Sequence, residues 1–169
     1  MEKLLPRLNL YVGRDEDYEK HKNDPEFRFA RCCKYGPGGH QQTLGYKTLA
    51  APKDSNYLWV KRPNRIALNL IDQDDPGFIP EECIEKALEY IKDQLDAGKK
   101  VIVCCNSGHS RGPTTALLFL RTIGEMPHSF VIAERIYRTL YPPYSPGQGM
   151  RQRARQMWDK LENKYESNT

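Results

Sequence analysis

The sequence predicts a single α/β domain spanning residues 1–169, and three observations support this fold class. Short apolar segments rich in β-branched residues alternate along the chain with amphipathic segments of helical period. At residues 101–120 an apolar strand leads through a short polar stretch directly into an apolar helix. A chain of 169 residues is long enough for one domain with a substantial core and too short for two of ordinary size.

The first half of the chain predicts four strands and one short helix. The predicted strands are apolar or alternate in hydrophobicity, and the predicted helix is charged along most of its length. The strands cover residues 8–12, 27–34, 58–60 and 66–71, and the helix covers residues 15–22. Between the second and third strands, residues 35–56 combine a Gly-Pro-Gly-Gly run with weak periodicity, which predicts a long loop.

The second half predicts helices on either side of the central strand. Residues 80–97 have a regular apolar face, with Pro80 in the first turn and Gly98 just past the end. Residues 129–140 predict a helix with Ser129 as its N-cap. One apolar stripe of that helix consists of Ile132, Ile136 and Leu140.

The last predicted helix covers residues 150–165 and follows a turn-rich connector at residues 141–149. Its apolar residues recur at helical spacing, which predicts a stripe that packs into the core. These residues are Met150, Ala154, Met157, Trp158 and Leu161.

Composition excludes several classes of protein. Hydrophobic residues make up 38% and charged residues 28% of the chain, as in a soluble globular domain. No apolar run approaches the length of a membrane span, and the N-terminal segment lacks the form of a secretory signal, so we expect no membrane association. The net charge of +4 is mild and favours an anionic substrate without indicating a nucleic-acid partner. We expect a monomer.

The five cysteines predict a reducing environment. Four of them form two adjacent pairs and the fifth stands alone: Cys32, Cys33, Cys83, Cys104 and Cys105. An odd number of cysteines in vicinal pairs does not suit an extracellular disulfide framework. We therefore expect a cytoplasmic protein.

The polar stretch at residues 105–111 carries the strongest chemical signal. It lies between a buried strand and a helix, so successive backbone N–H groups can point inward and form an anion nest backed by the helix N-terminus. Such a site favours the thiolate, which is the nucleophilic form of Cys105. Arg111 adds a planar pair of donors that matches two phosphate oxygens, and Gly108 allows the tight backbone path.

This stretch resembles the phosphate-binding loop of cysteine-dependent protein phosphatases, in which five residues separate a Cys from an Arg, and its context is most similar to the dual-specificity branch. The resemblance implies a mixed, mainly parallel sheet flanked by helices, with the loop at the end of the central strand. It implies that Cys105 is the nucleophile and that Arg111 binds the phosphate. The remaining loop residues implied to bind the substrate are Asn106, Ser107, Gly108, His109 and Ser110.

The resemblance further implies a phosphorylated protein or peptide as substrate and a reaction that uses no cofactor. The sequence shows no convincing cluster of metal ligands. A second functional class stays open, because a catalytically impaired module of the same fold would bind phosphate without turning it over.

A general acid is expected in the acidic turn at residues 72–75. A phosphate ester needs its leaving oxygen protonated, and a carboxylic acid at the mouth of the site can supply the proton and later activate water. In the phosphatases that the chain resembles, this acid lies about thirty residues before the nucleophile. That spacing favours Asp74, with Asp72 and Asp75 as close alternatives.

Two residues depart from the pattern of these phosphatases. Cys104 stands where a histidine usually precedes the nucleophile, and Gly112 stands where a serine or threonine usually follows the arginine. Both departures concern the rate of the reaction rather than phosphate binding, and they favour the impaired binding module as the alternative function.

Overall fold

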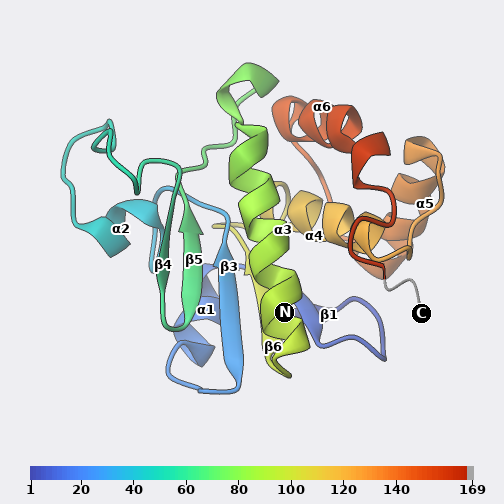
Figure 1. Cartoon of the computed structure of the whole chain (residues 1–169), viewed down its shortest axis with the longest axis horizontal. Helices are drawn as coiled ribbons and strands as arrows, with labels where there is room; N and C mark the ends of the chain where they lie inside the picture. The colour runs from blue at the N-terminus through green and yellow to red at the C-terminus, as the bar shows by residue number, and fades with distance from the viewer. Residues whose placement is uncertain (167–169) are drawn as a thin grey trace.

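A computed structural model describes residues 1–166 of the chain, which form one six-stranded sheet with helices on both faces (Figure 1). The strands are β1 (Glu2–Lys3), β2 (Leu10–Gly13), β3 (Phe27–Arg31), β4 (Trp59–Arg62), β5 (Arg65–Leu68) and β6 (Lys100–Cys104). Their order across the sheet is β1-β2-β6-β3-β5-β4. The inner four strands are parallel, and β1 and β4 pair antiparallel at the two edges. The predicted mixed, mainly parallel sheet is therefore confirmed.

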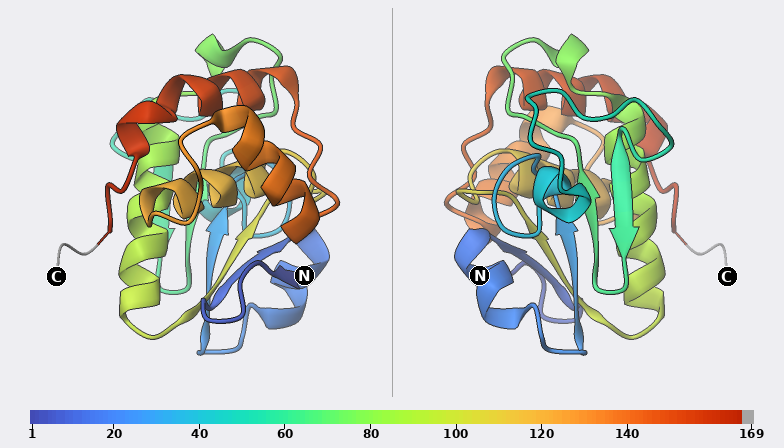
Figure 2. Two further views of the ribbon diagram at one scale, coloured as in Figure 1. Left: turned by 90° about the vertical axis from the view of Figure 1, so that its right-hand side faces the viewer. Right: turned by 90° about the vertical axis from the view of Figure 1, so that its left-hand side faces the viewer.

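Six α-helices and two 3₁₀ turns complete the described residues. They are α1 (Asp15–His21), α2 (His40–Leu44), α3 (Glu81–Asp96), α4 (Arg111–Thr122), α5 (Phe130–Leu140) and α6 (Gln148–Met157), with 3₁₀ turns η1 (Pro76–Phe78) and η2 (Asp159–Leu161). Figure 2 shows α4, α5 and α6, coloured from yellow-orange to red, gathered beside one another. No helix within residues 1–166 has the length and apolar character needed to cross a membrane.

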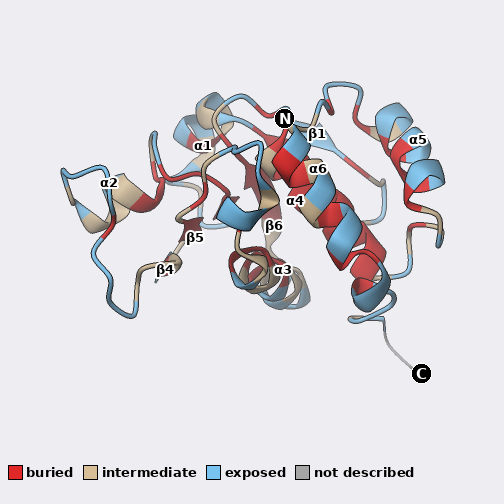
Figure 3. Cartoon of the chain, turned by 90° about the horizontal axis from the view of Figure 1, so that it is seen from above, coloured by how far each residue is buried: buried red, intermediate tan, exposed pale blue. Residues whose placement is uncertain are grey.

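Alternate residues of β6 serve two separate apolar clusters, because successive side chains of a strand point to opposite faces. Val101 and Val103 lie in the larger core together with residues of α3, α4, α5 and α6. Ile102 and Cys104 lie in a smaller cluster with aromatic residues of α1 and β3. Figure 3 shows α1 and α3 on opposite sides of the sheet. Cys105 continues the alternation and joins the larger core.

Three features of the strands differ from the prediction, and the first is that the strand predicted at residues 27–34 ends at Arg31. The second is β1, an edge strand of two residues that is too short to show a period in the sequence and was not predicted. Third, the strand predicted at residues 66–71 ends at Leu68, where its pairing with Trp59 of β4 also ends. Beyond it the Leu70 N–H turns back to the Leu68 carbonyl at 2.9 Å. The carbonyl of Leu70 accepts hydrogen bonds from the Lys34 N–H at 2.9 Å and from Arg111, which belongs to the site described below.

The long loop predicted at residues 35–56 contains the short helix α2. This helix has only five residues, which is too few for a periodic signal, and Gly45 ends it in the left-handed conformation at φ +82°. The last helix also differs from the prediction, since α6 begins at Gln148 and ends at Met157. The reason is that the carbonyl of Trp158 accepts a hydrogen bond from Arg121 Nε at 3.1 Å instead of continuing the helix.

Two of the three residues in the apolar stripe predicted on α5 do not face the core, whereas the third, Leu140, is partly buried against it. Ile132 and Ile136 are 49% and 40% exposed, whereas Phe130, Ala133 and Tyr137 of the same helix are buried. The predicted N-cap is confirmed, because the Ser129 hydroxyl accepts a hydrogen bond from the N–H of Ile132. The apolar stripe predicted for the last helix is buried throughout, so that prediction is confirmed despite the shorter helix.

Candidate active site

The candidate site is the loop of residues 105–110, which leaves the C-terminal end of β6 and ends where α4 begins at Arg111. β6 lies between β2 and β3 in the interior of the sheet. Ligands of open parallel sheets bind outside the carboxyl ends of such strands. Cys105 directly follows β6, and only 1% of its surface is exposed. The loop thus begins at the proposed nucleophile and delivers Arg111 as the first residue of a helix.

The oxygen atoms of the loop are tied to groups outside it. Four hydrogen bonds do this: Asp15 N–H to Asn106 O (3.3 Å), the Tyr141 hydroxyl to Gly108 O (2.6 Å), Ser145 N–H to His109 O (2.8 Å) and Gly147 N–H to Ser110 Oγ (2.8 Å). By contrast, the backbone N–H groups of residues 106–111 donate no hydrogen bond to any part of residues 1–166. A run of unpaired N–H groups that ends at a helix N-terminus is an anion-binding arrangement.

Gly108 is required by the path of the loop. Its φ of +76° lies in the left-handed region, and a Cβ at this position would lie 3.2 Å from Tyr141 Oη and 3.3 Å from the carbonyl oxygen of Gly13. On this side the loop borders a cavity of about 260 Å³, whose lining includes Ser107 and His109. All five predicted substrate-binding residues lie in this one loop between Cys105 and Arg111, and two of them, Ser107 and His109, border the cavity.

The guanidinium of Arg111 is held through both of its terminal nitrogens. Nη1 donates to the carbonyl of Leu70 at 3.0 Å, and Nη2 donates to Oδ1 of Asn106 at 2.8 Å. These bonds leave three of the five N–H groups of a guanidinium without an acceptor in residues 1–166. The free donors and the loop N–H groups together can meet the oxygens of one tetrahedral dianion.

The three candidate acids of the acidic turn differ in their surroundings. The carboxylate of Asp75 caps the 3₁₀ turn η1 by accepting from the Gly77 N–H at 2.8 Å. Asp74 is exposed, and its side chain makes no hydrogen bond within residues 1–166. Asp72 lies against Gly147, since a Cβ on that glycine would be 2.6 Å from Asp72 Oδ1. Of the three acids, only Asp72 contacts a residue that itself holds the loop.

Residues of helix α6 contact the acidic turn and the 3₁₀ turn that follows it. Arg153 donates to the carbonyls of Pro76 and Ile79 at 2.6 and 2.8 Å. Gly149 approaches the turn so closely that a Cβ there would lie 1.9 Å from the carbonyl oxygen of Gln73. Helix α6, together with the connector before it, therefore supports both the loop and the acidic turn.

The surroundings of Cys104 account for the absence of a histidine before the nucleophile. Cys104 is fully buried on the face of β6 opposite to Cys105, and its thiol lies beside the fully buried guanidinium of Arg31. Burial raises the pKa of this thiol, and the charge of Arg31 opposes the rise. A protonated histidine at this position would place two cations together inside the domain, which is strongly unfavourable.

Gly112 brings α4 into direct contact with the backbone of the nucleophile. A Cβ at this position would lie 3.0 Å from the nitrogen of Cys105 and 3.1 Å from Cα of Cys104. A serine or threonine, as the resembled phosphatases have, would need the loop to shift by a few tenths of an ångström. The close approach of α4 therefore leaves no room for a hydroxyl-bearing side chain at this position unless the backbone moves.

A buried carboxylate joins α5, the connector and α6. Glu134 of α5, whose side chain is 2% exposed, accepts from the Tyr144 hydroxyl at 2.9 Å and from Nε and Nη2 of Arg151 at 3.0 and 2.7 Å. Burial alone would raise the pKa of Glu134, but the hydrogen bonds from Arg151 and Tyr144 outweigh it and hold the pKa below its usual value. The connector that holds three of the four loop oxygens is anchored in this way.

Glu134→Gln is expected to lower the free energy of unfolding by about 1.5–3 kcal/mol near neutral pH, the range for hydrogen bonds to a charged group. Because the folded-state pKa of Glu134 is depressed, its contribution is present above the unfolded-state pKa of about 4.3 and fades as the pH falls through the folded-state value. Urea denaturation at pH 7 and below pH 4 should therefore show the gap between wild type and variant narrowing in acid. An equal gap at both pH values would contradict a role for the ionised carboxylate.

Residues 35–58 form a wall next to the site. The carbonyl of Tyr35 accepts a hydrogen bond from Asn106 Nδ2 at 3.0 Å, so this segment contacts the loop directly. A cavity of about 190 Å³ separates the segment from the acidic turn. Its lining includes Tyr57, Leu58, Ile71, Gln73 and Phe78. Phe78 is 70% exposed at its edge, which gives the hollow an apolar rim.

Comparison with known proteins identifies the fold. No protein-family model and no curated protein sequence matches the chain. Its structure is similar to that of human DUSP28, with a TM-score of 0.66 and 15% identity over 95% of this chain and 97% of that one. DUSP15 is also similar, with a TM-score of 0.64 and 15% identity over 95% and 89% of the two chains.

A third similar structure is the human tyrosine phosphatase-like serine/threonine/tyrosine-interacting protein. Its TM-score is 0.61, and the identity is 16% over 92% of this chain and 93% of that one. The chain therefore has the dual-specificity phosphatase fold, as the resemblance of its loop predicted.

Proposed function

We propose that the chain is a phosphoprotein phosphatase that hydrolyses phosphotyrosine and/or phosphoserine/threonine esters through a cysteinyl-phosphate intermediate. The observation that carries this proposal is the run of unpaired N–H groups between Cys105 and Arg111. The fold supports it, because structures similar to this one are phosphatases. We further propose a cytoplasmic location, which the five unpaired cysteines, all within the described residues, favour on grounds of redox environment. We also propose a monomer.

The first step transfers the phosphoryl group to sulfur. The loop N–H groups and the free donors of Arg111 bind three phosphate oxygens, and the Cys105 thiolate attacks phosphorus from the opposite side to the leaving oxygen. As the S–P bond forms, the P–O bond to the substrate breaks. A carboxylic acid of the acidic turn gives its proton to the departing oxygen.

The second step releases the phosphate. The carboxylate left by the first step takes a proton from a water molecule, whose oxygen attacks phosphorus while the S–P bond breaks. The products are inorganic phosphate, the Cys105 thiolate and the reprotonated acid, so the enzyme returns to its starting state. The same donors stabilise the transition states of both steps, because the charge on the phosphoryl oxygens remains within the loop.

Substitution of the general acid should lower kcat for phenyl phosphate by about 10²–10⁴-fold. The loss should be smaller for nitrophenyl phosphate, whose leaving group needs little protonation. The spacing in the sequence favours Asp74, whereas the contact of Asp72 with Gly147 favours Asp72. Steady-state kinetics of Asp72→Asn and Asp74→Asn with both esters, between pH 5 and 8, assign the role to the variant whose loss depends on the leaving group.

Asp75→Asn completes this series, because Asp75 is the remaining candidate acid and its carboxylate is occupied by the Gly77 N–H. We expect it to change kcat for both esters by the same small factor. If none of the three variants responds to the leaving group, the acidic turn does not supply the acid.

A second candidate function is a phosphate-binding module that recognises phosphoproteins without hydrolysing them. A phosphatase-like interacting protein shares this fold, and positions 104 and 112 depart from the phosphatase pattern. Wild-type protein that binds tungstate and a phosphopeptide but hydrolyses neither aryl ester would establish this alternative. Turnover that is lost in Cys105→Ser would exclude it.

A further inference from the structure

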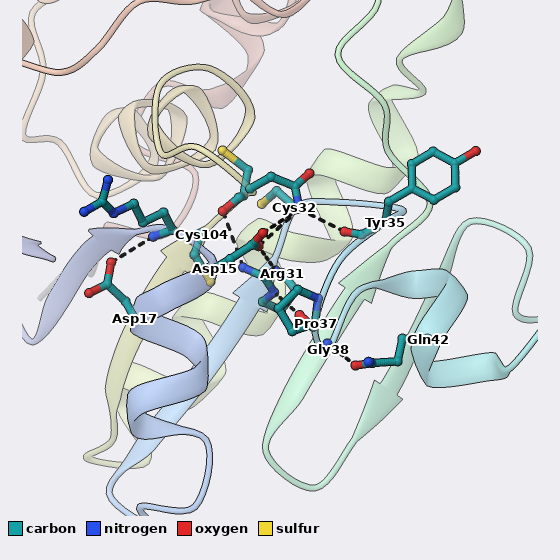
Figure 4. Close-up of polar contacts among 12 residues, drawn as sticks. Asp15, Asp17, Arg31, Cys32, Tyr35, Pro37, Gly38, Gln42 and Cys104 are labelled. Atoms are coloured by element: carbon teal, nitrogen blue, oxygen red, sulfur yellow. Dashed lines mark hydrogen bonds and ion pairs between the residues drawn. The ribbon is translucent and has the colours of Figure 1, made fainter.

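A fully buried arginine behind the loop has no part in the proposed mechanism. Arg31 ends β3, and none of its surface is exposed. Its guanidinium donates to the Pro37 carbonyl from Nε at 3.0 Å, approaches the Cys105 carbonyl from Nη1 at 3.5 Å and pairs with Asp15 Oδ1 from Nη2 at 2.5 Å (Figure 4). Burying a charged group costs desolvation free energy. A buried arginine whose nitrogens all have partners is therefore expected to have a role beyond packing.

Asp15, which pairs with Arg31, also contacts the side-chain amide of Asn106. Its Oδ1 and Oδ2 lie 3.1 and 3.3 Å from Asn106 Nδ2, which also donates to the Tyr35 carbonyl at 3.0 Å. Both amide hydrogens are therefore directed at acceptors. The contact is closely packed, because a Cβ on Gly36 would lie 2.5 Å from the same nitrogen.

The orientation of the Asn106 amide follows from these contacts. With Nδ2 facing Asp15 and Tyr35, Oδ1 faces Arg111 and accepts from Nη2 at 2.8 Å. The reversed amide would set its oxygen against a carboxylate and a carbonyl, and its NH₂ group against the guanidinium. The charge of Asp15 thus decides which atom Asn106 presents to Arg111.

We propose that Arg31 and Asp15 are positioning residues that hold the Arg111 guanidinium ready for an oxyanion, acting through Asn106. This inference rests on the proposed function, since it assumes that Arg111 binds the phosphate. The ion pair of Arg31 fixes Asp15, Asp15 fixes the Asn106 amide, and Asn106 together with the Leu70 carbonyl fixes the plane of Arg111. Preorganisation of this kind spares the site the ordering of a long side chain at the moment of binding.

Three variants test the proposal. Asp15→Asn removes the charge while preserving the shape of the side chain. The double variant Arg31→Met, Asp15→Leu removes both charges at once, so that no buried charge is left unpaired and the fold is kept. The matched control is Glu16→Gln, which neutralises the neighbouring acid in the same first turn of α1. Within residues 1–166, Glu16 forms an ion pair with Arg14 alone, at the surface.

Each variant is examined for tungstate affinity by calorimetry, for kcat and KM with phenyl phosphate, for thermal stability, and for the ¹H–¹⁵N signals of the Arg111 and Asn106 side chains. We expect the two charge-removing variants to bind tungstate about 10–100-fold more weakly than wild type, the effect of losing one well-placed hydrogen bond to a charged group. Their Asn106 and Arg111 signals should move, and Glu16→Gln should match wild type in every measurement. A stable double variant with this weaker binding separates positioning from a purely structural role.

Wild-type tungstate affinity and unshifted Arg111 signals in the two charge-removing variants would overturn the inference and leave the proposed function intact. Tungstate binding without turnover in the wild type would instead remove the phosphatase activity, and the inference would still be decided by affinity and the side-chain signals. Absence of tungstate binding in the wild type would overturn both.

Discussion

Cys105→Ser is expected to abolish hydrolysis of aryl phosphates while leaving tungstate binding close to that of the wild type. A serine hydroxyl at this position has neither a positioned base nor the acidity of a thiol, so attack on phosphorus does not proceed at a useful rate. Loss of a catalytic nucleophile elsewhere lowers kcat by on the order of 10⁶-fold, and a fall towards the limit of detection is expected here. The loop N–H groups and Arg111 are unchanged, so the oxyanion site persists.

Steady-state kinetics and calorimetry on the same preparation check both halves of this prediction. Cys83→Ser is the matched control, because Cys83 is another fully buried cysteine, in α3, and lies outside the loop. That variant should retain wild-type kcat. Appreciable turnover by Cys105→Ser would refute the covalent mechanism, whatever the fate of tungstate binding.

Arg111→Lys is expected to lower kcat/KM by about 10²–10³-fold, the usual effect of removing one preorganised donor to a developing negative charge. A lysine keeps the positive charge but cannot offer two parallel N–H groups to the phosphate. It also cannot bridge the Leu70 carbonyl and Asn106 Oδ1 with separate nitrogens, so the orientation of its side chain is lost as well. In contrast to Cys105→Ser, this variant should also lose affinity for tungstate.

Arg155→Lys in α6 is the appropriate control for Arg111→Lys, since Arg155 is an exposed arginine outside the loop. It should leave both kcat/KM and tungstate affinity unchanged. Equal tungstate affinity in Arg111→Lys and wild type would contradict the assignment of Arg111 to the oxyanion site.

The parts of the site that could be predicted are those formed by neighbouring residues. The strand, the polar turn and the helix at residues 101–120 are continuous in the sequence, so the pattern of apolar and polar residues located the loop between Cys105 and Arg111. The same holds for Gly108, whose place in a tight turn demands a positive φ. Local periodicity likewise predicted the inner strands and the helix α3.

The contacts behind the loop could not be predicted, because they join distant parts of the chain. Asp15 lies 91 residues before Asn106, and its place in a short charged helix looks like that of any surface acid. Arg31 lies 74 residues before Cys105, and nothing in an alternating strand marks one arginine as fully buried. A charged arginine inside a predicted inner strand is the one signal that could have drawn attention to it.

The error on α5 has the same origin. The helical period grouped Ile132 and Ile136 in one apolar stripe, but the tertiary structure leaves both exposed and buries Glu134 and Tyr137 instead. Glu134 can be buried there because Tyr144 of the connector and Arg151 of α6 donate hydrogen bonds to its carboxylate. A burial pattern that depends on a partner 17 residues away is invisible to a helical periodicity of 3.6.

The attachment of the acidic turn to α6 bears on the kinetics of ligand binding. Arg153 and the close approach of Gly149 to Gln73 join the turn to the helix that also supports the loop. We therefore expect the turn to keep the same conformation when an ester binds, without the closing movement of a lid. Rapid-mixing experiments should accordingly show oxyanion binding as a single exponential whose rate rises linearly with ligand concentration, without a slower concentration-independent phase.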